Sequence, residues 1–350
     1  MAKILLIGPK TNKKDPEKTG GVIVLFEQFL ADLRKTDIGT IEVDSNMLNY
    51  RSRLHGFLSI YKNILLNIMK ADHVSLHGTV NGYLFIAPVV LLAAKIFGKT
   101  VSLRKFGGSF NEIYENSSRI KRFLIKQILR HADYSFFETK YLVEYFRKWN
   151  KKTFWFPNVR KQAIIPSMPR SYSKRFVFIS HVRRSKGIDQ ILGASLLLDP
   201  GYVIDIYGPI MDDEYTPDDF KKYKVSYKGS IEHAKVLSTL NKYDVLILPS
   251  FGEGYPGIII EAYSLGIPVI ATRLPSVMEI CNDGIEGILV DVGNTVQLAE
   301  AMRQFNPVNY PLYSRNAYKS FDMFRSETYT EWFIQEVKLN HRTGVTGERD

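Results

Sequence analysis

PSFGEGYPGIIIE, residues 249–261, is the stretch of sequence that decides the fold. It follows an apolar run, Asp244 to Leu248, whose Val-Leu-Ile-Leu core is typical of a buried parallel strand. We expect a helix from Ile258 to Leu265, ended by Gly266, and then a second strand over 269–271. The unit is therefore strand, loop, helix, strand. Its loop lies at the carboxyl end of a strand, where open α/β sheets bind ligands.

The composition of this loop suits an anionic ligand. Gly252, Gly254 and Gly257 carry no side chain that would block an approach to the backbone. Pro256 suits the first turn of a helix, and the free N–H groups of that turn carry a partial positive charge. The loop therefore predicts a phosphate site at the start of the helix.

Two carboxylates, Glu253 and Glu261, flank the predicted phosphate site. A carboxylate beside a phosphate is repelled unless it faces a hydrogen-bond donor, and sugar hydroxyls are natural donors. One carboxylate before the helix and one inside it would hold two sugars on either side of a diphosphate, which describes a nucleotide sugar. The alternative is an ordinary strand–helix–strand unit with two solvated glutamates.

The pattern continues beyond the loop. Glu-x7-Glu with an internal Gly-Tyr-Pro-Gly precedes Glu261-Ala-x-x-x-Gly-x-Pro-Val-Ile-Ala, and the whole resembles the donor-binding signature of the retaining family 4 (group 1) glycosyltransferases. The resemblance implies a GT-B fold, which is two Rossmann-like domains facing across a cleft. It also implies a catalytic role for Glu253. The donor-binding residues that it implies in this stretch are Gly254, Tyr255, Pro256, Gly257, Ile258 and Glu261.

Length and composition agree with a two-domain globular protein. The chain has 350 residues, of which 45% are hydrophobic. Its single cysteine, Cys281, excludes an internal disulfide and favours a reducing compartment. The apolar core at the N-terminus is too short for a signal peptide, and the run from Tyr83 to Ala94 is too short to cross a bilayer. We therefore expect a cytoplasmic protein.

The formal net charge of +11 favours anionic partners, namely nucleotides, nucleic acid or an acidic membrane. A basic nucleic-acid-binding protein is an alternative function. However, the sequence contains no recognised nucleic-acid-binding motif, and the charge falls on predicted helices rather than beside a stacking platform. We therefore expect no nucleic-acid partner.

In the first half of the chain, glycine pairs and polar residues follow predicted strands. Gly20 and Gly21 open a helix after the first strand. A glycine pair is by itself more often only a turn, but the resemblance implies a loop here that faces the donor and acceptor. His77 ends a strand and either faces the cleft or is a hydrogen-bonded structural histidine. Where many family members carry His-Gly, this chain has Phe106-Gly107. Lys105, Arg104 or the backbone of Gly107 and Gly108 is therefore the expected contact to the donor or acceptor in the cleft.

In the second half, the run from His181 to Gly187 follows a predicted strand and is basic. The family has an Arg and a Lys-Gly here that neutralise the donor diphosphate. The resemblance therefore assigns Lys186 to catalysis. The position of the family Arg falls on His181, so Arg183 or Arg184 would supply the second charge, and we favour Arg183 for catalysis and Arg184 for donor binding. The alternative is a solvated basic turn. Gly229 ends the segment that reads the nucleobase in the family, and it completes the predicted donor site.

We expect neither a metal nor a cofactor. No Asp-x-Asp motif stands at a strand end, and the pairs Asp212-Asp213 and Asp218-Asp219 fall in a polar loop. The nucleotide-diphospho-sugar is a substrate. The basic side chains and the helix start near Gly257 would stabilise the leaving diphosphate.

One predicted helix, Arg119 to His131, is both basic and amphipathic. It would dock on the anionic inner face of a membrane, and the acceptor would then be a lipid-linked glycan. The alternative is an ordinary domain helix with a solvated face. The expected apolar face comprises Ile120, Phe123, Leu124, Ile128 and Leu129, and the expected basic face comprises Arg119, Arg122, Lys126 and Arg130.

The sequence thus predicts an α/β protein of the GT-B class. Residues 1–165 form an acceptor-side domain joined by a C-terminal helix over 325–342, and residues 166–324 form the donor domain. The predicted function is a retaining, metal-independent glycosyltransferase that moves a sugar from a nucleotide-diphospho-sugar to a glycan or lipid-linked glycan, in bacterial surface polysaccharide biosynthesis. A nucleotide-sugar epimerase of the same fold is the alternative, because it would share the donor site.

Overall fold

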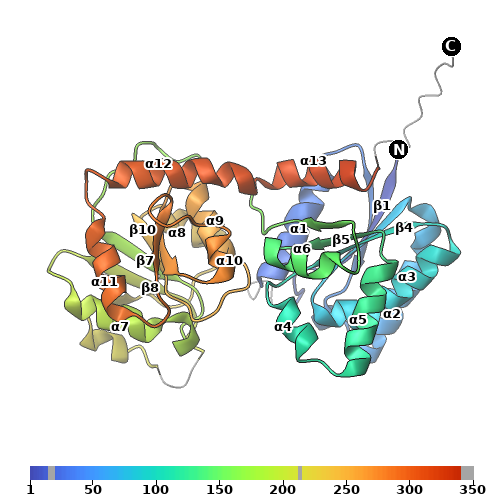
Figure 1. The fold of residues 1–350 in the computed structure, drawn as a ribbon, viewed down its shortest axis with the longest axis horizontal. Coiled ribbons are helices and arrows are strands. Elements are labelled where there is room, and N and C mark those ends of the chain that lie inside the picture. Colours follow the sequence, from blue (N-terminus) through green and yellow to red (C-terminus); the bar gives the residue numbers. More distant parts are fainter. Residues whose placement is uncertain (15–19, 212–214, 340–350) are drawn as a thin grey trace, which may run out of the picture. The chain divides into compact units, whose positions relative to one another are not determined.

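A computed structural model describes residues 1–14, 20–211 and 215–339 (Figure 1). The chain divides into two compact units. Unit 1 comprises Met1–Lys161 together with the segment that begins at Ser326, and unit 2 comprises Gln162–Arg325. Two features named from the sequence lie outside the described residues. They are the pair Asp212-Asp213 and the end of the predicted C-terminal helix over 340–342.

Unit 1 is built on a parallel six-stranded sheet in the order β2-β1-β3-β4-β5-β6. Strand order reverses between β1 and β3, so the loops after these two strands diverge at a topological switch point. The strands are β1 (Lys3–Gly8), β2 (Gly39–Asp44), β3 (His73–Gly78), β4 (Thr100–Lys105), β5 (Tyr134–Phe137) and β6 (Thr153–Trp155). The α-helices are α1 (Gly21–Leu33), α2 (Arg53–Asn67), α3 (Ala87–Ile96), α4 (Phe110–Glu115), α5 (Arg119–His131), α6 (Lys140–Arg147) and α13 (Ser326–Glu336).

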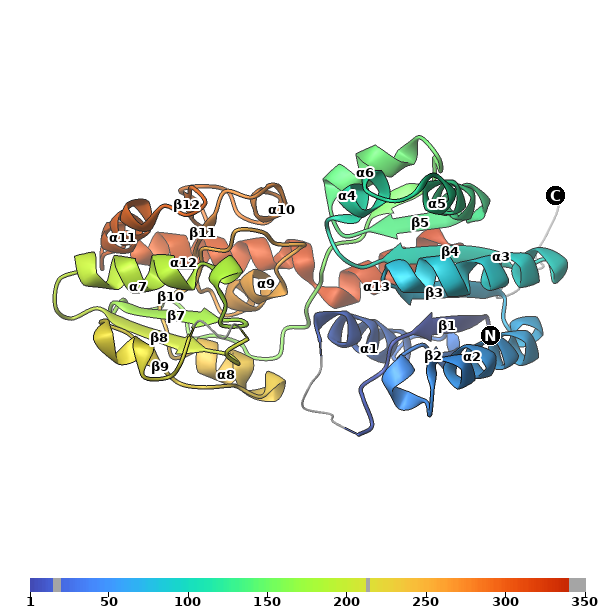
Figure 2. The ribbon, with the colours of Figure 1, turned by 90° about the horizontal axis from the view of Figure 1, so that it is seen from below.

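Helices cover both faces of this sheet, so its strands bury polar side chains, such as His73, Ser75 and Arg104, together with their apolar ones. Side chains alternate between the faces, so Leu5 and Ile7 pack beneath α2, α3, α5 and α6, whereas Ile4 and Leu6 pack beneath α1 and α13. Figure 2 shows α3 lying along one face of β3 and β4. The sheet is thus a middle layer with helices on either side.

The last helix, α13, returns to the sheet of the first half of the chain. Its Phe333 ring lies 5.0 Å from that of Phe29, 5.3 Å from that of Phe136 and 6.3 Å from that of Phe156, measured between ring centroids. Truncating a buried phenylalanine of this kind costs about 3–5 kcal/mol. This aromatic cluster therefore holds the C-terminal helix in unit 1.

Unit 2 repeats the design with a second parallel six-stranded sheet in the order β12-β11-β10-β7-β8-β9, and its strand order reverses between β7 and β10. Helices α7 and α11 cover one face, and α8, α9 and α12 cover the other (Figure 2). The strands are β7 (Arg175–Ile179), β8 (Val203–Tyr207), β9 (Ser226–Tyr227), β10 (Val245–Leu248), β11 (Val269–Thr272) and β12 (Gly287–Val290). The α-helices are α7 (Ile188–Leu197), α8 (Val236–Leu240), α9 (Gly257–Ser264), α10 (Pro275–Met278), α11 (Thr295–Gln304) and α12 (Tyr310–Ser320).

The structure corrects the predicted faces of α5. Its buried residues are Ile125, Ile128 and Leu129, because this stripe faces the sheet. Ile120 and Phe123 were expected on the packed face, yet they are 75% and 59% exposed. The helix therefore has a second apolar stripe, which the core of unit 1 does not cover. No helix among the described residues is both long enough and apolar enough to cross a bilayer.

Three strands begin after an aspartate that binds the start of a neighbouring strand. Asp72 accepts the N–H of Lys3 at 2.9 Å, and Asp133 accepts that of Val101 at 2.7 Å. In unit 2, Oδ2 of Asp244 accepts the N–H groups of Ser173 and Arg175 at 2.7 and 2.9 Å. These carboxylates accept hydrogen bonds from backbone N–H groups at the starts of strands, where the hydrogen bonds between strands do not yet satisfy them.

We predict that Asp244→Ala lowers the free energy of unfolding by about 1.5–3 kcal/mol, because it removes a charged acceptor shared by two amides. Urea unfolding followed by circular dichroism measures the change. Asp199→Ala, which alters an exposed aspartate of the same unit, is the matched control. Equal unfolding of the two variants would contradict the structural role of Asp244.

Candidate functional site

The candidate site in unit 2 is built from two loops that meet at the switch point. One loop follows β7 and runs to Gly187, and the other follows β10 and begins at Pro249. The N–H of Phe251 donates to the carbonyl oxygen of Ser185 at 2.9 Å. Gly187 has a φ of +77°, and a Cβ on it would lie 2.1 Å from the carbonyl oxygen of Pro249. The close contact between the loops therefore requires glycine at this position.

Lys186 and Glu253 face each other across this contact. Nζ of Lys186 lies 2.6 Å from Oε1 of Glu253, and the two side chains are only 14% and 11% exposed. The hydroxyl of Ser250 donates to the same carboxylate oxygen at 2.7 Å, and that of Ser276 donates to the Glu253 carbonyl at 2.8 Å. A partly buried ion pair held by two hydroxyls is geometrically fixed, as a binding site requires.

The other cations of the β7 loop differ in their surroundings. Arg184 turns toward the first turn of α7, where its Nε lies 3.2 Å from Oδ2 of Asp189, and both side chains are largely exposed. Arg183 is half-buried, and its Nε has no hydrogen-bond partner among the described residues. The pKa of His181 is lowered by its burial and by the positive charges of Arg183 and Lys186. The positive charges of Arg183 and Lys186 are thus both felt at His181, and an anion bound beside this residue would be attracted to both.

Helix α9 begins beside this cluster of charges. Pro256 is its N-cap, and no side-chain hydrogen bond caps its first amides. Tyr255 and Pro256 are buried, while Gly254, Gly257 and Ile258 are partly exposed. Glu261 lies one turn into the helix and is 6% exposed. The helix start can therefore contribute N–H groups to a ligand that also touches the β7 loop.

The last predicted donor residue, Gly229, follows β9. It adopts a φ of +78°, and its carbonyl accepts the N–H of Gly208 at 2.8 Å. Gly208 in turn packs against the end of β7, because a Cβ on it would lie 1.7 Å from the carbonyl of Ser180. The ends of β7, β8 and β9 are thus adjacent. The structure gathers the predicted donor residues of unit 2 along the carboxyl ends of its strands.

In unit 1, Gly20 and Gly21 line a cavity of about 620 Å³. Gly20 is the N-cap of α1, and the cavity also touches Gly78 and Thr79 after β3. This position is the switch point of the first sheet, which is a typical place for ligands. Ser45, Asn46, Arg53 and Asn81, which were not singled out from the sequence, also line the cavity and provide polar groups.

His77 is fully buried in unit 1. Its Nε2 lies 2.9 Å from the hydroxyl of Ser75, and its ring packs beside those of Phe26 and Phe29. Burial holds its pKa well below the usual range, so the ring is neutral. This geometry corresponds to the hydrogen-bonded structural histidine rather than to a cleft contact.

The side chain of Lys105 also points inward. Its amine donates to the carbonyl of Phe106 and lies 4.7 Å from the centre of the Phe110 ring, and burial lowers its pKa to about 8. The N–H of Gly107 donates to Oε2 of Glu138 at 2.8 Å. Gly107 and Gly108 are accessible. A substrate could therefore contact the backbone of Gly107 and Gly108, but not the side chain of Lys105.

Glu138 was missed as a site residue. It is 4% exposed, and burial raises its pKa, while the Gly107 amide and the nearby Arg104 and Lys105 oppose that rise. The signal in the sequence was its place after β5, where a polar residue ends an apolar strand. Its carboxylate holds the loop at Gly107 in place by accepting the N–H of that residue.

No group of three or more His, Cys, Asp or Glu side chains in the described part of the chain could hold a metal ion. Asp218 and Asp219 pair with Lys221 and Lys222 at 2.6 and 2.9 Å. The pKa of Asp219 is lowered to about 2 by hydrogen bonds from Lys222 and Thr216.

Comparison with known proteins identifies the domain that carries the candidate site. Residues 173–305 match the family model "Glycosyl transferases group 1". Unit 2 contains a group 1 glycosyltransferase domain. The group 1 assignment expected from the sequence is therefore confirmed, and the two parallel six-stranded sheets match GT-B glycosyltransferase structures, as the predicted fold requires.

Two relatives and one solved structure illustrate the similarity. The chain is 28% identical over 127 residues to an uncharacterized 41.2 kDa protein in the cps region of Klebsiella pneumoniae, which covers 36% of this chain and 35% of that protein. It is 35% identical over 111 residues to the Vi polysaccharide biosynthesis protein VipC/TviE of Salmonella typhi, which covers 30% of this chain and 17% of that protein. The chain thus spans about a third or less of the length of these relatives.

The crystal structure of Anabaena Alr3699/HepE in complex with UDP-glucose superposes with a TM-score of 0.72. It covers 97% of this chain and 100% of that chain at 14% identity. At this identity the likeness concerns the fold.

We predict that Gly187→Ala destabilises unit 2 by about 1–3 kcal/mol more than Gly201→Ala does. Both glycines have positive φ, but a Cβ at Gly187 would meet Pro249, whereas one at Gly201 would meet nothing within 4 Å. The strain of positive φ is therefore common to both variants, and the difference isolates the contact between the loops. Urea midpoints measure it, and equal midpoints would show that the loops separate without cost.

Proposed function

We propose that the protein is a retaining family 4 glycosyltransferase that moves a sugar from a nucleotide-diphospho-sugar to a glycan or lipid-linked glycan in bacterial surface polysaccharide biosynthesis. The observation that carries the proposal is the Lys186–Glu253 pair at the switch point of a group 1 glycosyltransferase domain. The relatives from a cps region and from Vi polysaccharide biosynthesis support the biological setting. The UDP-glucose complex of HepE supports a nucleotide-sugar donor.

The proposed roles follow from charge and position. Lys186 and Arg183 stabilise the leaving diphosphate, whose negative charge grows as the glycosidic bond breaks. Lys186 has three N–H donors, so it can hold Glu253 and a phosphate oxygen together. Glu253 binds hydroxyls of the transferred sugar, and Glu261, inside α9, binds those of the ribose. The reaction needs no metal in this scheme, because the cations and the start of α9 take up the charge.

The acceptor approaches on the face that the diphosphate leaves, so the scheme assigns no general base. In unit 1 the Gly20-Gly21 cavity and the Gly107-Gly108 backbone are the proposed contacts for the remaining parts of the substrates. Lys105 contributes through the loop that it supports, since its amine is internal.

Calorimetry on three variants tests the donor site, after UDP-, GDP- and ADP-sugars have been screened for thermal stabilisation. Glu261→Ala should weaken the binding of both the nucleoside diphosphate and the intact donor by roughly ten- to a hundredfold, because a charge-assisted hydrogen bond is worth about 1.5–3 kcal/mol. Glu253→Ala should weaken the binding of the intact donor alone, because it removes the ligand of the transferred sugar. Binding of the nucleoside diphosphate should persist, since Lys186 stays available for it. Lys186→Ala should lower turnover most.

Glu232→Ala, at an exposed glutamate that pairs with Lys235, is the control. If Glu253→Ala and Glu261→Ala both bind like this control, the two carboxylates are not donor ligands. Incubating the donor without acceptor distinguishes the transferase from the epimerase. An epimerase would convert the donor sugar under those conditions, whereas a transferase would not.

We further propose that α5 docks unit 1 on an anionic membrane surface as a peripheral protein at the inner face of the membrane. Its Arg119 and Arg130 lie on the exposed side with Ile120 and Phe123. Basic residues near such a surface contribute about 1 kcal/mol each, and apolar side chains add to the binding.

Arg119→Gln combined with Arg130→Gln should therefore weaken cosedimentation with anionic vesicles by roughly thirtyfold. Lys242→Gln combined with Lys319→Gln removes two exposed lysines of unit 2 and should change little. Equal binding of the parent protein to anionic and neutral vesicles would refute the docking.

A further inference from the structure

Three helices on one face of the sheet of unit 1 differ in charge from the two helices on the other face. Helices α2, α3 and α5, on one face of the sheet, contain no aspartate or glutamate. Helices α1 and α13, on the other face, contain no lysine or arginine, but they do contain acidic residues. Figure 1 shows α2, α3 and α5 beside one another at the lower right. We call the surface formed by α2, α3 and α5 the cationic side of unit 1.

The cationic side is also apolar at its surface. Leu58 and Leu65 of α2, Leu92 and Ile96 of α3, and Phe123 of α5 are all more than half exposed. The five cations of α5 form no ion pair with any described residue, so their charge is not cancelled locally. Exposed apolar groups among unpaired cations on one face indicate an interaction surface rather than a solvated one.

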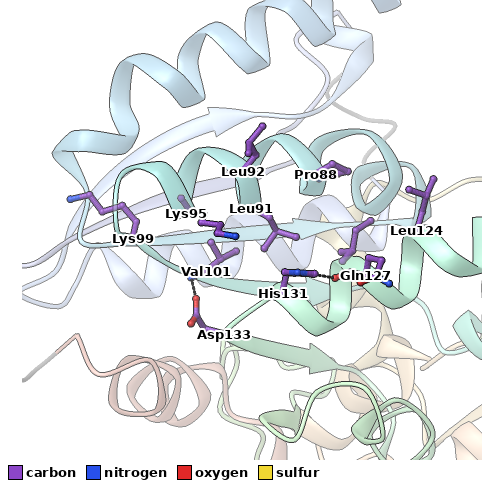
Figure 3. A pocket seen from close by; sticks show the side chains of 12 residues that line it. Pro88, Leu91, Leu92, Lys95, Lys99, Val101, Leu124, Gln127, His131 and Asp133 are labelled. Atoms are coloured by element: carbon purple, nitrogen blue, oxygen red, sulfur yellow. Dashed lines mark hydrogen bonds between the residues drawn. The ribbon is translucent and has the colours of Figure 1, made fainter.

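A groove of about 430 Å³ lies between α3 and α5 on this side (Figure 3). Its walls are apolar and include Leu91, Leu124 and Ile128. Lys95 and Lys99 border it toward the C-terminal end of α3. The volume falls within the range of small-molecule sites.

The polar groups of the groove are consistent with an anion at its end. Asp133 is the carboxylate among the described lining residues, and its Oδ2 accepts the N–H of Val101 at 2.7 Å. Nδ1 of His131 lies 2.8 Å from the carbonyl of Gln127. The amine of Lys95 makes no hydrogen bond or ion pair with a described residue, whereas that of Lys99 lies 3.4 Å from the carbonyl of Met69. A negatively charged group at this end would thus meet the two lysine amines, whose positive charges outnumber the single negative charge of Asp133.

We propose that this groove binds an acyl chain of an anionic phospholipid, with the phosphate of the headgroup beside Lys95 and Lys99. The proposal rests on the membrane docking proposed above and names the lipid group that the surface receives. It does not depend on sugar transfer. Apolar walls suit a hydrocarbon chain, and the lysines suit the phosphate to which that chain is attached.

Other occupants fit these observations less well. A second copy of the chain would bring two sets of the acid-free helices α2, α3 and α5 together, which Coulomb repulsion opposes. A single-stranded nucleic acid would need aromatic side chains for stacking, and none of the described residues lining the groove is Phe, Tyr or Trp.

The buried state of the only cysteine allows a direct test. Cys281 is 1% exposed, so a cysteine placed in the groove by Leu124→Cys can be labelled alone with a polarity-sensitive fluorophore. We expect a blue shift when vesicles of phosphatidylglycerol and phosphatidylcholine are added, and quenching when their acyl chains are brominated. Leu312→Cys, an exposed leucine on α12 of unit 2, carries the label in the control and should show neither effect.

A charge variant completes the test. Lys95→Gln combined with Lys99→Gln should lower the affinity for these vesicles by roughly thirtyfold and remove the quenching of the Leu124→Cys label. Lys242→Gln combined with Lys319→Gln, in unit 2, should leave both unchanged.

The outcomes separate the two proposals. Cosedimentation with anionic vesicles without quenching at position 124 overturns the groove proposal and leaves membrane docking intact. A blue shift without vesicles that rises with protein concentration, together with a dimer in analytical ultracentrifugation, overturns it in favour of a second copy. Donor binding is measured separately by calorimetry without vesicles, so its failure would concern the transferase proposal alone.

Discussion

The contact between Gly187 and the carbonyl of Pro249 sets the geometry of the candidate donor site. Strand order places β7 beside β10, and the absence of a Cβ lets the loops after these strands touch. That contact brings an ammonium from one loop to 2.6 Å from a carboxylate of the other. The cations, the acid and the start of α9 therefore occupy fixed positions before any ligand arrives, which lowers the cost of ordering them on binding.

Much of this arrangement was visible in the sequence, for identifiable reasons. Short apolar runs are typical of parallel strands buried on both faces, so the ranges expected for β10 and β11 agree with the structure to within a residue. The glycines and the proline around Glu253 predicted a loop that leads into a helix, and α9 is that helix. Here local chemistry decides the local structure, so a single sequence is sufficient.

Other features depend on partners that are distant in the sequence. The pairing of Lys186 with Glu253 follows from strand order, which periodicity does not reveal. His77 and Lys105 end strands as cleft residues do, yet neighbouring aromatic rings enclose them. In α5 two apolar stripes compete, and only the sheet beneath determines which one is buried. Helix α12 was not predicted, because its buried stripe of Tyr310, Ser314 and Ala317 includes a serine and a small alanine and is therefore weakly apolar.

The return of α13 to unit 1 has a consequence for the order of folding during synthesis. The pocket that Phe333 fills, among Phe29, Phe136 and Phe156, is made by residues translated far earlier. All of unit 2 must be synthesised in between. At typical translation rates this interval is on the order of ten to thirty seconds, during which an aromatic surface of the nascent first half stays uncovered. Unit 2 is continuous in the chain and can close its own core as it leaves the ribosome, so the half translated first is the last to be completed.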